Sequence, residues 1–142
     1  MKLIQADKRF ELHIDSYEFP YDENGANEDN NWLNVAVEWE DEVLVENAVS
    51  PCLLTSELED LIRGLGKVLL NECYQSAFLE PDLEVSAMPA QEQVQLAISY
   101  AKKGRSRFYM DALISKQELD EIISDLHEMS MRFPQRKAKL LH

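Results

Sequence analysis

The segment that decides the fold is Leu33-Asn34-Val35-Ala36-Val37-Glu38-Trp39, in which large apolar residues occupy every second position. Successive side chains of a strand point to opposite faces of a sheet, so this spacing predicts a strand with one buried and one polar face. Residues 10–15 show the same alternation and predict an earlier strand. Between the two strands, Pro20 and the polar residues 21–31 predict a loop.

Further strands follow this pair. Asp41-Glu42 predicts a tight turn, after which Val43-Leu44-Val45 begins a returning strand that Ser50-Pro51 ends. The second half of the chain contains more segments of strand character, separated by turn residues. They cover residues 76–80, 83–87, 94–100 and 108–114, with turns at Pro81-Asp82 and Lys102-Lys103-Gly104-Arg105.

Two helices are predicted, each from a capping sequence followed by an apolar stripe. The first begins at Ser56-Glu57-Leu58-Glu59, with Ser56 or Thr55 as the cap. The second begins at Ser115-Lys116-Gln117-Glu118, and Pro134 ends it. The stripes consist of Leu58, Leu61, Ile62, Leu65 and Leu69 in the first helix and of Leu119, Ile122, Ile123, Leu126, Met129 and Phe133 in the second.

The order of elements predicts the fold class. It reads β-β-β-α-β-β-β-α, and short connections between strands favour antiparallel pairing. The simplest way to bury one face of each strand and one stripe of each helix is an α+β, two-layer domain. We expect a curved antiparallel sheet of about five to six strands with both helices packed on one face. No linker or internal repeat is evident, so residues 1–142 form a single domain, with residues 135–142 as a mobile basic tail.

The charge of the chain is strongly negative. Its 142 residues contain 14 Lys and Arg against 27 Asp and Glu, a formal net charge of −13. Residues 10–62 contain no Lys or Arg at all. Such a chain is repelled by phosphate backbones and anionic membranes, which argues against direct binding to either. The acidic block is therefore a solvated surface or a docking face for a basic partner, partly offset by Lys102, Lys103, Arg105 or Arg107.

Compartment and thiol state follow from simple features. No run of 18 apolar residues predicts a membrane-spanning helix, and the first eight residues carry charge too early for a signal peptide. We therefore expect a cytoplasmic protein. Cys52 and Cys73 are 21 positions apart and form no C-x-x-C pair, so we expect two free, buried thiols rather than a disulfide.

A search for catalytic motifs yields little. Gly64-Leu65-Gly66-Lys67 is the nearest approach to a phosphate-binding loop, but it lies inside the first predicted helix. There the two glycines weaken the helix by about 1 kcal/mol each and are expected to permit close packing. His13, His127 and His142 form no cluster with each other or with a cysteine. We expect no cofactor, no metal and no enzymatic activity.

Two acidic features leave alternatives open. The loop at residues 22–29 is either a polar loop with turn-forming Asn and Gly residues or an irregular calcium site, since Gly25 falls outside the EF-hand register. Carboxylate pairs such as Asp22/Glu23 and Glu38/Glu40 are abundant; Glu38 and Glu40 share a strand face and could in principle act as acid and base, a weak signal in so acidic a chain. Trp39 continues the apolar face and is expected in the core. Trp32 lies on the opposite face, where it either covers the sheet edge or anchors a partner.

Several segments together resemble a known family. They are Leu12-His13-Ile14-Asp15-Ser16-Tyr17-Glu18-Phe19-Pro20, then Asp29-Asn30-Asn31-Trp32-Leu33-Asn34-Val35, and Thr55-Ser56-Glu57-Leu58 before the first helix. With the capped helix near Leu119 that ends at Pro134, they resemble the WapI family of bacterial immunity proteins over nearly the whole chain. Cys52, Cys73 and the basic tail are not part of the resemblance.

The resemblance implies a non-enzymatic cytosolic antitoxin. Its toxin would be the C-terminal domain of a WapA- or Rhs-type cell-wall-associated protein that acts on contact, and such domains are commonly nucleases, some of which cleave transfer RNA. A dense anionic face suits an inhibitor that fills a basic, RNA-binding cleft. The alternatives are an acidic adaptor or scaffold without a toxin, and a small carboxylate-dependent enzyme. The candidate partner-binding residues are Asp22, Glu23, Glu28, Asp29, Trp32, Glu38, Glu40, Asp41 and Glu42.

Overall fold

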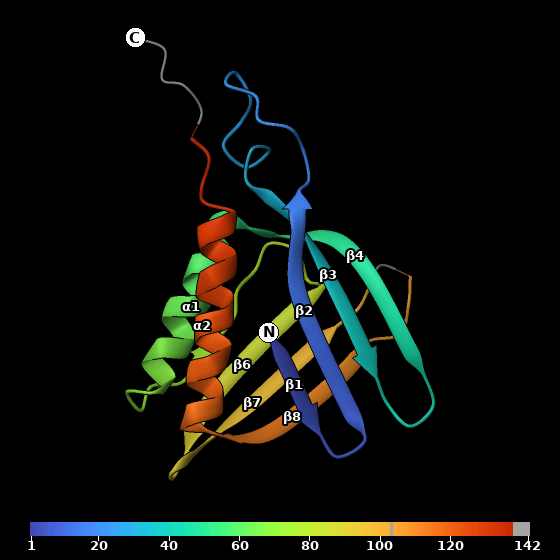
Figure 1. The fold of residues 1–142 in the computed structure, drawn as a ribbon, viewed down its shortest axis with the longest axis vertical. Coiled ribbons are helices and arrows are strands. Elements are labelled where there is room, and N and C mark those ends of the chain that lie inside the picture. Colours follow the sequence, from blue (N-terminus) through green and yellow to red (C-terminus); the bar gives the residue numbers. More distant parts are fainter. Residues whose placement is uncertain (103, 138–142) are drawn as a thin grey trace.

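The computed structural model describes residues 1–102 and 104–137 and shows two halves with the same order of elements, four strands followed by a helix (Figure 1). The sequence alone gave no sign of this repeat. No helix of the described residues is long and apolar enough to cross a membrane. The first half comprises β1 (Lys2–Gln5), β2 (Lys8–Tyr17), β3 (Trp32–Glu40), β4 (Val45–Leu54) and α1 (Thr55–Val68). The second comprises β5 (Tyr74–Gln75), β6 (Leu83–Ala90), β7 (Gln93–Tyr100), β8 (Phe108–Ser115) and α2 (Lys116–Arg132).

The strands form two antiparallel sheets, which we call sheet A (β1-β2-β3-β4) and sheet B (β5-β6-β7-β8). The predicted α+β class with antiparallel pairing is confirmed. The prediction of one curved sheet of five to six strands is wrong, because β4 leads into α1 and the chain then starts a separate sheet. Strand patterns alone do not tell which strands pair across a helical connection, and the short β1 and β5 carry too little pattern to be recognised.

The two sheets pack against each other through their apolar faces (Figure 1). The rings of Phe10 in β2 and Phe108 in β8 stack with their centroids 6.2 Å apart. The ring centroids of Trp39 and Tyr100 are 5.4 Å apart. A buried hydrogen bond of 2.8 Å joins the hydroxyls of Ser50 and Tyr100 across the sheets. Trp39 is therefore a core residue, as predicted. Because both inner faces are filled, each sheet presents its opposite face to solvent.

Both helices close one side of this core. Figure 1 shows α1 and α2 side by side, and α1 contacts β4, β5 and β6 while α2 contacts β7 and β8. The predicted apolar stripes face inward: Leu58, Leu61 and Leu65 are buried in α1, as are Leu119, Ile122, Leu126 and Met129 in α2. The helices thus pack at the junction of two sheets rather than on one face of a single sheet.

The start of α2 is confirmed, whereas that of α1 differs from the prediction. Ser115 Oγ accepts the Glu118 amide at 3.0 Å, and the Glu118 carboxylate accepts the Ser115 amide at 3.3 Å. In α1 the N-cap is Leu54, and Glu57 rather than Glu59 reaches back, accepting the Leu54 amide at 2.9 Å. Neither Ser56 nor Thr55 caps the helix, because β4 continues as far as Leu54 and the helix begins directly after it.

Several strand limits also differ. Val43 and Leu44 lie in the turn, and β4 runs past Pro51 through a register shift opposite Leu33 and Asn34. Proline is tolerated there because β4 is the edge strand of sheet A. The candidate strand at residues 76–80 is not formed; β5 precedes it. In the turn between β7 and β8 the Arg105 amide donates to the Lys102 carbonyl, while Lys103 lies outside the described residues.

The two cysteines are free, as predicted, but only one of them is buried. Cys52 lies in β4 and faces the core, whereas Cys73 is exposed in the connection after α1. Burial raises the pKa of the Cys52 thiol to about 12, so the thiol stays protonated at neutral pH. A buried, protonated thiol is a poor nucleophile.

Candidate partner-binding surface

The acidic residues predicted to dock a partner fall into two groups at opposite ends of sheet A. The first group, Asp22, Glu23, Glu28 and Asp29, lies in the loop of residues 18–31 before β3. The second group, Glu38, Glu40, Asp41 and Glu42, lies at the end of β3 and in the turn that follows. The eight residue steps from Trp32 to Glu40 separate the two ends by about 27 Å along the strand. We call them the loop end and the turn end of sheet A.

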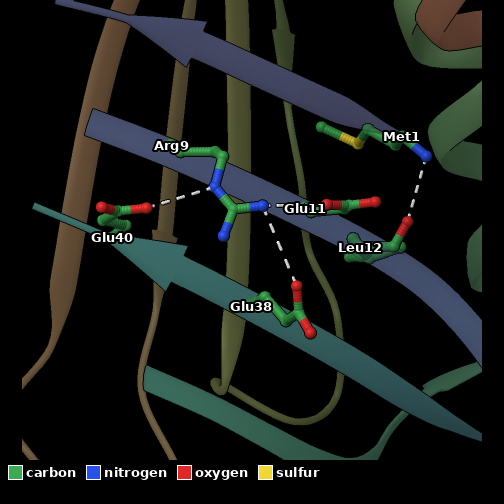
Figure 2. Close-up of polar contacts among 6 residues, drawn as sticks. All are labelled: Met1, Arg9, Glu11, Leu12, Glu38 and Glu40. Atoms are coloured by element: carbon green, nitrogen blue, oxygen red, sulfur yellow. Dashed lines mark hydrogen bonds and ion pairs between the residues drawn. The ribbon is translucent and has the colours of Figure 1, made fainter. Parts of the chain in front are cut away.

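Carboxylates at the turn end are partly paired within the chain (Figure 2). Arg9 in β2 lies directly opposite Glu40 in the sheet register. Its guanidinium nitrogens lie 3.1 Å from Glu11, 3.9 Å from Glu38 and 3.5 Å from Glu40. One cation thus serves three carboxylates on the outer face of sheet A. Glu38 and Glu40 are held by this contact on an open surface, which does not suit them for acid–base catalysis.

The two turns at this end also meet. The Asp41 carboxylate accepts the amides of Val43 and Leu44, each at 2.9 Å, and so shapes the β3–β4 turn. The pKa of the Glu42 carboxyl is raised above its usual value, chiefly by a hydrogen bond and repulsion from Asp7 in the β1–β2 turn. Asp7 belongs to this acidic group but was missed, since only strand pairing places it there.

One of the proposed cations does offset the acidic block. Arg105 forms an ion pair of 3.0 Å with Glu46 in β4. Arg107 instead donates to the hydroxyl of Ser99 at 3.0 Å and to the carbonyls of Pro81 and Asp82. Surface ion pairs such as that of Arg105 contribute about 0–1 kcal/mol, and they reduce the local negative field.

The loop at residues 18–31 is folded rather than open chain. Asn30 is buried and connects two parts of the loop, because its side chain accepts the Asp22 amide at 2.8 Å and donates to the Asp22 carbonyl at 2.7 Å. The Asp22 carboxylate accepts the Asn24 amide at 2.9 Å. Buried Asn31 also contacts the loop, through the carbonyl of Asn27. Asparagine side chains thus replace the missing sheet partners of this backbone.

The segment after α2 holds this loop in place by hydrogen bonds. Arg136 donates to the carbonyls of Asn30 at 2.7 Å and Phe19 at 2.8 Å, and its guanidinium lies 3.6 Å above the ring of Tyr17. The Tyr21 hydroxyl donates to the carbonyl of Lys137 at 2.8 Å. Residues 138–142 lie outside the described part of the chain, so the mobility of the tail at residues 135–142 stays a prediction.

Carboxylates at the loop end are mostly unpaired. Glu23, Glu28 and Asp29 are exposed, and within residues 1–102 and 104–137 no hydrogen bond or ion pair reaches their carboxylates. Arg136 gives its side-chain N–H groups to carbonyl oxygens instead. This end of the molecule therefore projects negative charge that is not neutralised by direct contact.

Two grooves indent the loop end. One, of about 450 Å³, is lined by Phe19, Tyr21, Asp22 and Asp29. Phe19 and Tyr21 are each 48% exposed, so part of each ring is open to a partner, while the Tyr21 hydroxyl is held by the Lys137 carbonyl. The second groove, of about 430 Å³, lies beside Trp32.

The second groove contains Trp32. Its lining includes Glu18, Val49, Pro51, Glu80, Asp82 and Lys102. Trp32 is partly exposed at the start of β3, and so it lines an open groove beside the acidic loop. Partial burial raises the pKa of Glu18, and repulsion from Asp29 and Glu80 raises it further. The acidic surface at the loop end therefore also includes Glu18, Glu80 and Asp82, although no local sequence pattern connects these residues with the loop.

No metal centre is found among the described residues. Within residues 1–102 and 104–137 no group of three or more His, Cys, Asp or Glu is placed to hold a metal ion. His13 lies exposed on the outer face of sheet A, and His127 is exposed on α2, while His142 lies outside the described part. Sheet A therefore has two acidic ends, and grooves with aromatic rings in their lining lie at the loop end.

Comparison with known proteins identifies the family. The sequence matches the family described as immunity protein WapI-like over residues 2–134. The chain belongs to this family. It is accordingly an immunity protein, a class whose members bind a toxin. The resemblance noted in the sequence is thus confirmed. No curated protein sequence matches the chain.

Solved structures of other proteins share the fold of this immunity protein. The plant transcriptional regulator PBF-2 superimposes with a TM-score of 0.54 and 13% identity, covering 94% of this chain and 80% of its own. WHY3 from Arabidopsis thaliana superimposes with a TM-score of 0.53 and 13% identity, covering 95% of this chain and 86% of its own. At this identity the likeness concerns the fold alone.

Proposed function

We propose that this immunity protein protects the cytoplasm of its own cell by binding the C-terminal toxin domain of a WapA- or Rhs-type cell-wall-associated protein. The toxin domain is a nuclease, with transfer RNA as a candidate substrate, and binding blocks its cleft. The observation that carries the nuclease assignment is the unpaired acidic surface at the loop end, formed by exposed Glu23, Glu28 and Asp29.

The physical argument is one of charge competition. A nuclease that holds RNA presents Lys and Arg side chains to several phosphates. An inhibitor with net charge −13 is attracted to the same cations and excludes the phosphates once it is seated. The same charge keeps the inhibitor itself away from RNA. An acidic fold is therefore well suited to this task.

Co-expression tests the proposal directly. The toxin domain encoded next to the gene for this chain is expressed in cells with and without the chain, and growth of the cells is followed. We expect arrest without the chain and growth with it. With purified proteins, transfer-RNA cleavage should stop at about one chain per toxin domain. Continued arrest in the presence of the folded chain contradicts an immunity function against that toxin, and a toxin with no nuclease activity contradicts the substrate assignment.

Salt dependence tests the electrostatic part. We expect the association rate constant of the complex to fall at least about tenfold between about 50 mM and 500 mM NaCl, because salt screens the attraction that steers the encounter. Stopped-flow fluorescence of the intrinsic tryptophans measures this rate. Equal rate constants at both salt concentrations remove the steering mechanism, even where the complex itself forms.

A further inference from the structure

The two acidic ends of sheet A differ in what they offer a partner. At the turn end, Arg9 already contacts Glu38 and Glu40, and turn amides occupy the carboxylate of Asp41. At the loop end, the carboxylate of Asp29 stands free beside exposed Phe19. At Glu38, Glu40 and Asp41 a partner cation would have to displace an existing contact, whereas Glu42 contacts the like-charged Asp7. At the loop end the partner cation would meet an unpaired carboxylate.

Shape and side-chain type also favour the loop end. The groove of about 450 Å³ places the rings of Phe19 and Tyr21 beside Asp22 and Asp29. Aromatic faces attract Lys and Arg, and a nearby carboxylate adds a charged acceptor. The exposed apolar residues of the turn end are Val43, Leu44 and Val45, aliphatic side chains that offer a cation no π-face. Aromatic residues are also the ones that most often anchor interfaces.

The chain already contains an example of the same recognition. The guanidinium of Arg136 lies 3.6 Å above the ring of Tyr17 and 5.9 Å from that of Tyr21. It also fixes the backbone at Phe19 and Asn30 by hydrogen bonds to their carbonyls. The groove is therefore ordered before a partner arrives, and less conformational entropy is lost on binding.

We propose that the toxin docks at the loop end of sheet A and places a Lys or Arg side chain in the groove between Phe19, Tyr21 and Asp29, while the turn end stays outside the interface. This inference rests on the proposed function, since the occupant is the basic toxin domain. It adds the location of the interface, the chemical nature of the side chain that enters it, and two aromatic contact residues.

A matched pair of double variants tests the location. Phe19→Ala/Asp29→Asn removes one exposed apolar side chain and one negative charge at the loop end. Val43→Ala/Glu42→Gln removes the same two features at the turn end and leaves the same net charge. We expect the Kd for the purified toxin domain to rise at least about thirtyfold for the loop-end variant and to change less than about threefold for the control. Calorimetric titration measures both.

Each outcome has a distinct meaning. Equal affinity of both variants and the unmodified chain, or equal loss in both, overturns the inference, because location then has no effect. Loss only in the control places the interface at the turn end. Failure of the unmodified chain to bind or protect refutes the proposed function instead. Circular dichroism confirms that both variants fold. Hydrogen exchange in the complex should slow at residues 18–31 and remain unchanged at residues 38–45.

Discussion

Glu18 shows how a single residue reports the electrostatics of the whole site. Its carboxylate is partly buried near Asp29 and Glu80, which lie 11 and 62 positions further along the chain. Burial and the two like charges raise its pKa, so its ionised form is less stable in the folded protein than in the unfolded chain. Glu18 therefore opposes folding at neutral pH.

The pH dependence follows with a definite sign. Below about pH 4 the Glu18 carboxyl is protonated in both the folded protein and the unfolded chain and does not change the free energy of unfolding. The destabilisation appears as pH rises through the pKa that Glu18 has in the unfolded chain, and it is complete above the higher pKa that Glu18 has in the folded protein. We expect Glu18→Gln to stabilise the protein at pH 7 by about 0.5 kcal/mol or less and to have no effect near pH 3.5. Urea unfolding at both pH values measures this. Glu28→Gln, an exposed site, serves as control, and destabilisation by Glu18→Gln at pH 7 contradicts the reasoning.

Some residue roles were readable in the sequence and others were not. Alternation correctly placed Phe10 and Trp39 in the core, because burial of one strand face is a local property. The role of Arg136 was not predicted, since its partners Phe19 and Asn30 lie more than a hundred positions away. A basic residue in a terminal segment carries no local mark of such contacts.

Helix α1 shows how packing separates two residues that look alike in sequence. A methyl group added at Gly64 would lie 2.1 Å from the ring of Tyr74, whereas one added at Gly66 has nothing within 4 Å. The expected close approach is therefore made by Gly64, where Tyr74 of β5 lies against the helix. At Gly66 only the intrinsic weakness of glycine in a helix remains.

Substitution by alanine should consequently have opposite effects at these two sites. We expect Gly64→Ala to destabilise the protein by about 1–3 kcal/mol through overpacking against Tyr74. Gly66→Ala should stabilise it by about 0.5–1 kcal/mol through helix propensity. Denaturant unfolding of both variants gives the comparison. A stabilising Gly64→Ala would mean that Tyr74 moves aside at little cost.

The first turn of α1 explains why its boundary was misplaced. Glu57 and Glu59 give two capping registers, and the local sequence favours the one with Ser56 as the cap, because Leu54 has no side-chain oxygen to accept a backbone amide. The register with Glu57 is selected by a distant contact, since its second carboxylate oxygen accepts the Leu79 amide at 2.7 Å. Helix existence could be predicted from periodicity, but its exact start depended on tertiary structure.

At the scale of the whole molecule, the class of fold was predictable and its division into two sheets was not. Alternation shows that a strand has one buried face but not what covers that face. Here each sheet is covered by the other, through contacts such as Phe10 with Phe108. The candidate site was likewise predicted in part: the acidic loop was found, but its separation from the turn end required the length and direction of β3.

Net charge has a measurable effect on the isolated protein. At −13, mutual repulsion of carboxylates opposes the compact state, and salt screens this repulsion. We expect Tm to rise by about 2–4 °C between 10 mM and 300 mM NaCl, as for a gain of about 1 kcal/mol. Thermal unfolding followed by circular dichroism measures it, with KCl as the control for specific sodium binding. A Tm that falls with salt would show that attractive ion pairs dominate.

The way the loop at residues 18–31 is fastened has an evolutionary consequence. Arg136 donates hydrogen bonds to the main-chain carbonyls of Phe19 and Asn30, and these contacts do not depend on which side chain position 19 carries. Outward-facing positions such as Phe19, Glu23 and Glu28 can therefore mutate while the scaffold is inherited unaltered. Lineages that meet a new toxin have, in this loop, a region free to diversify under selection.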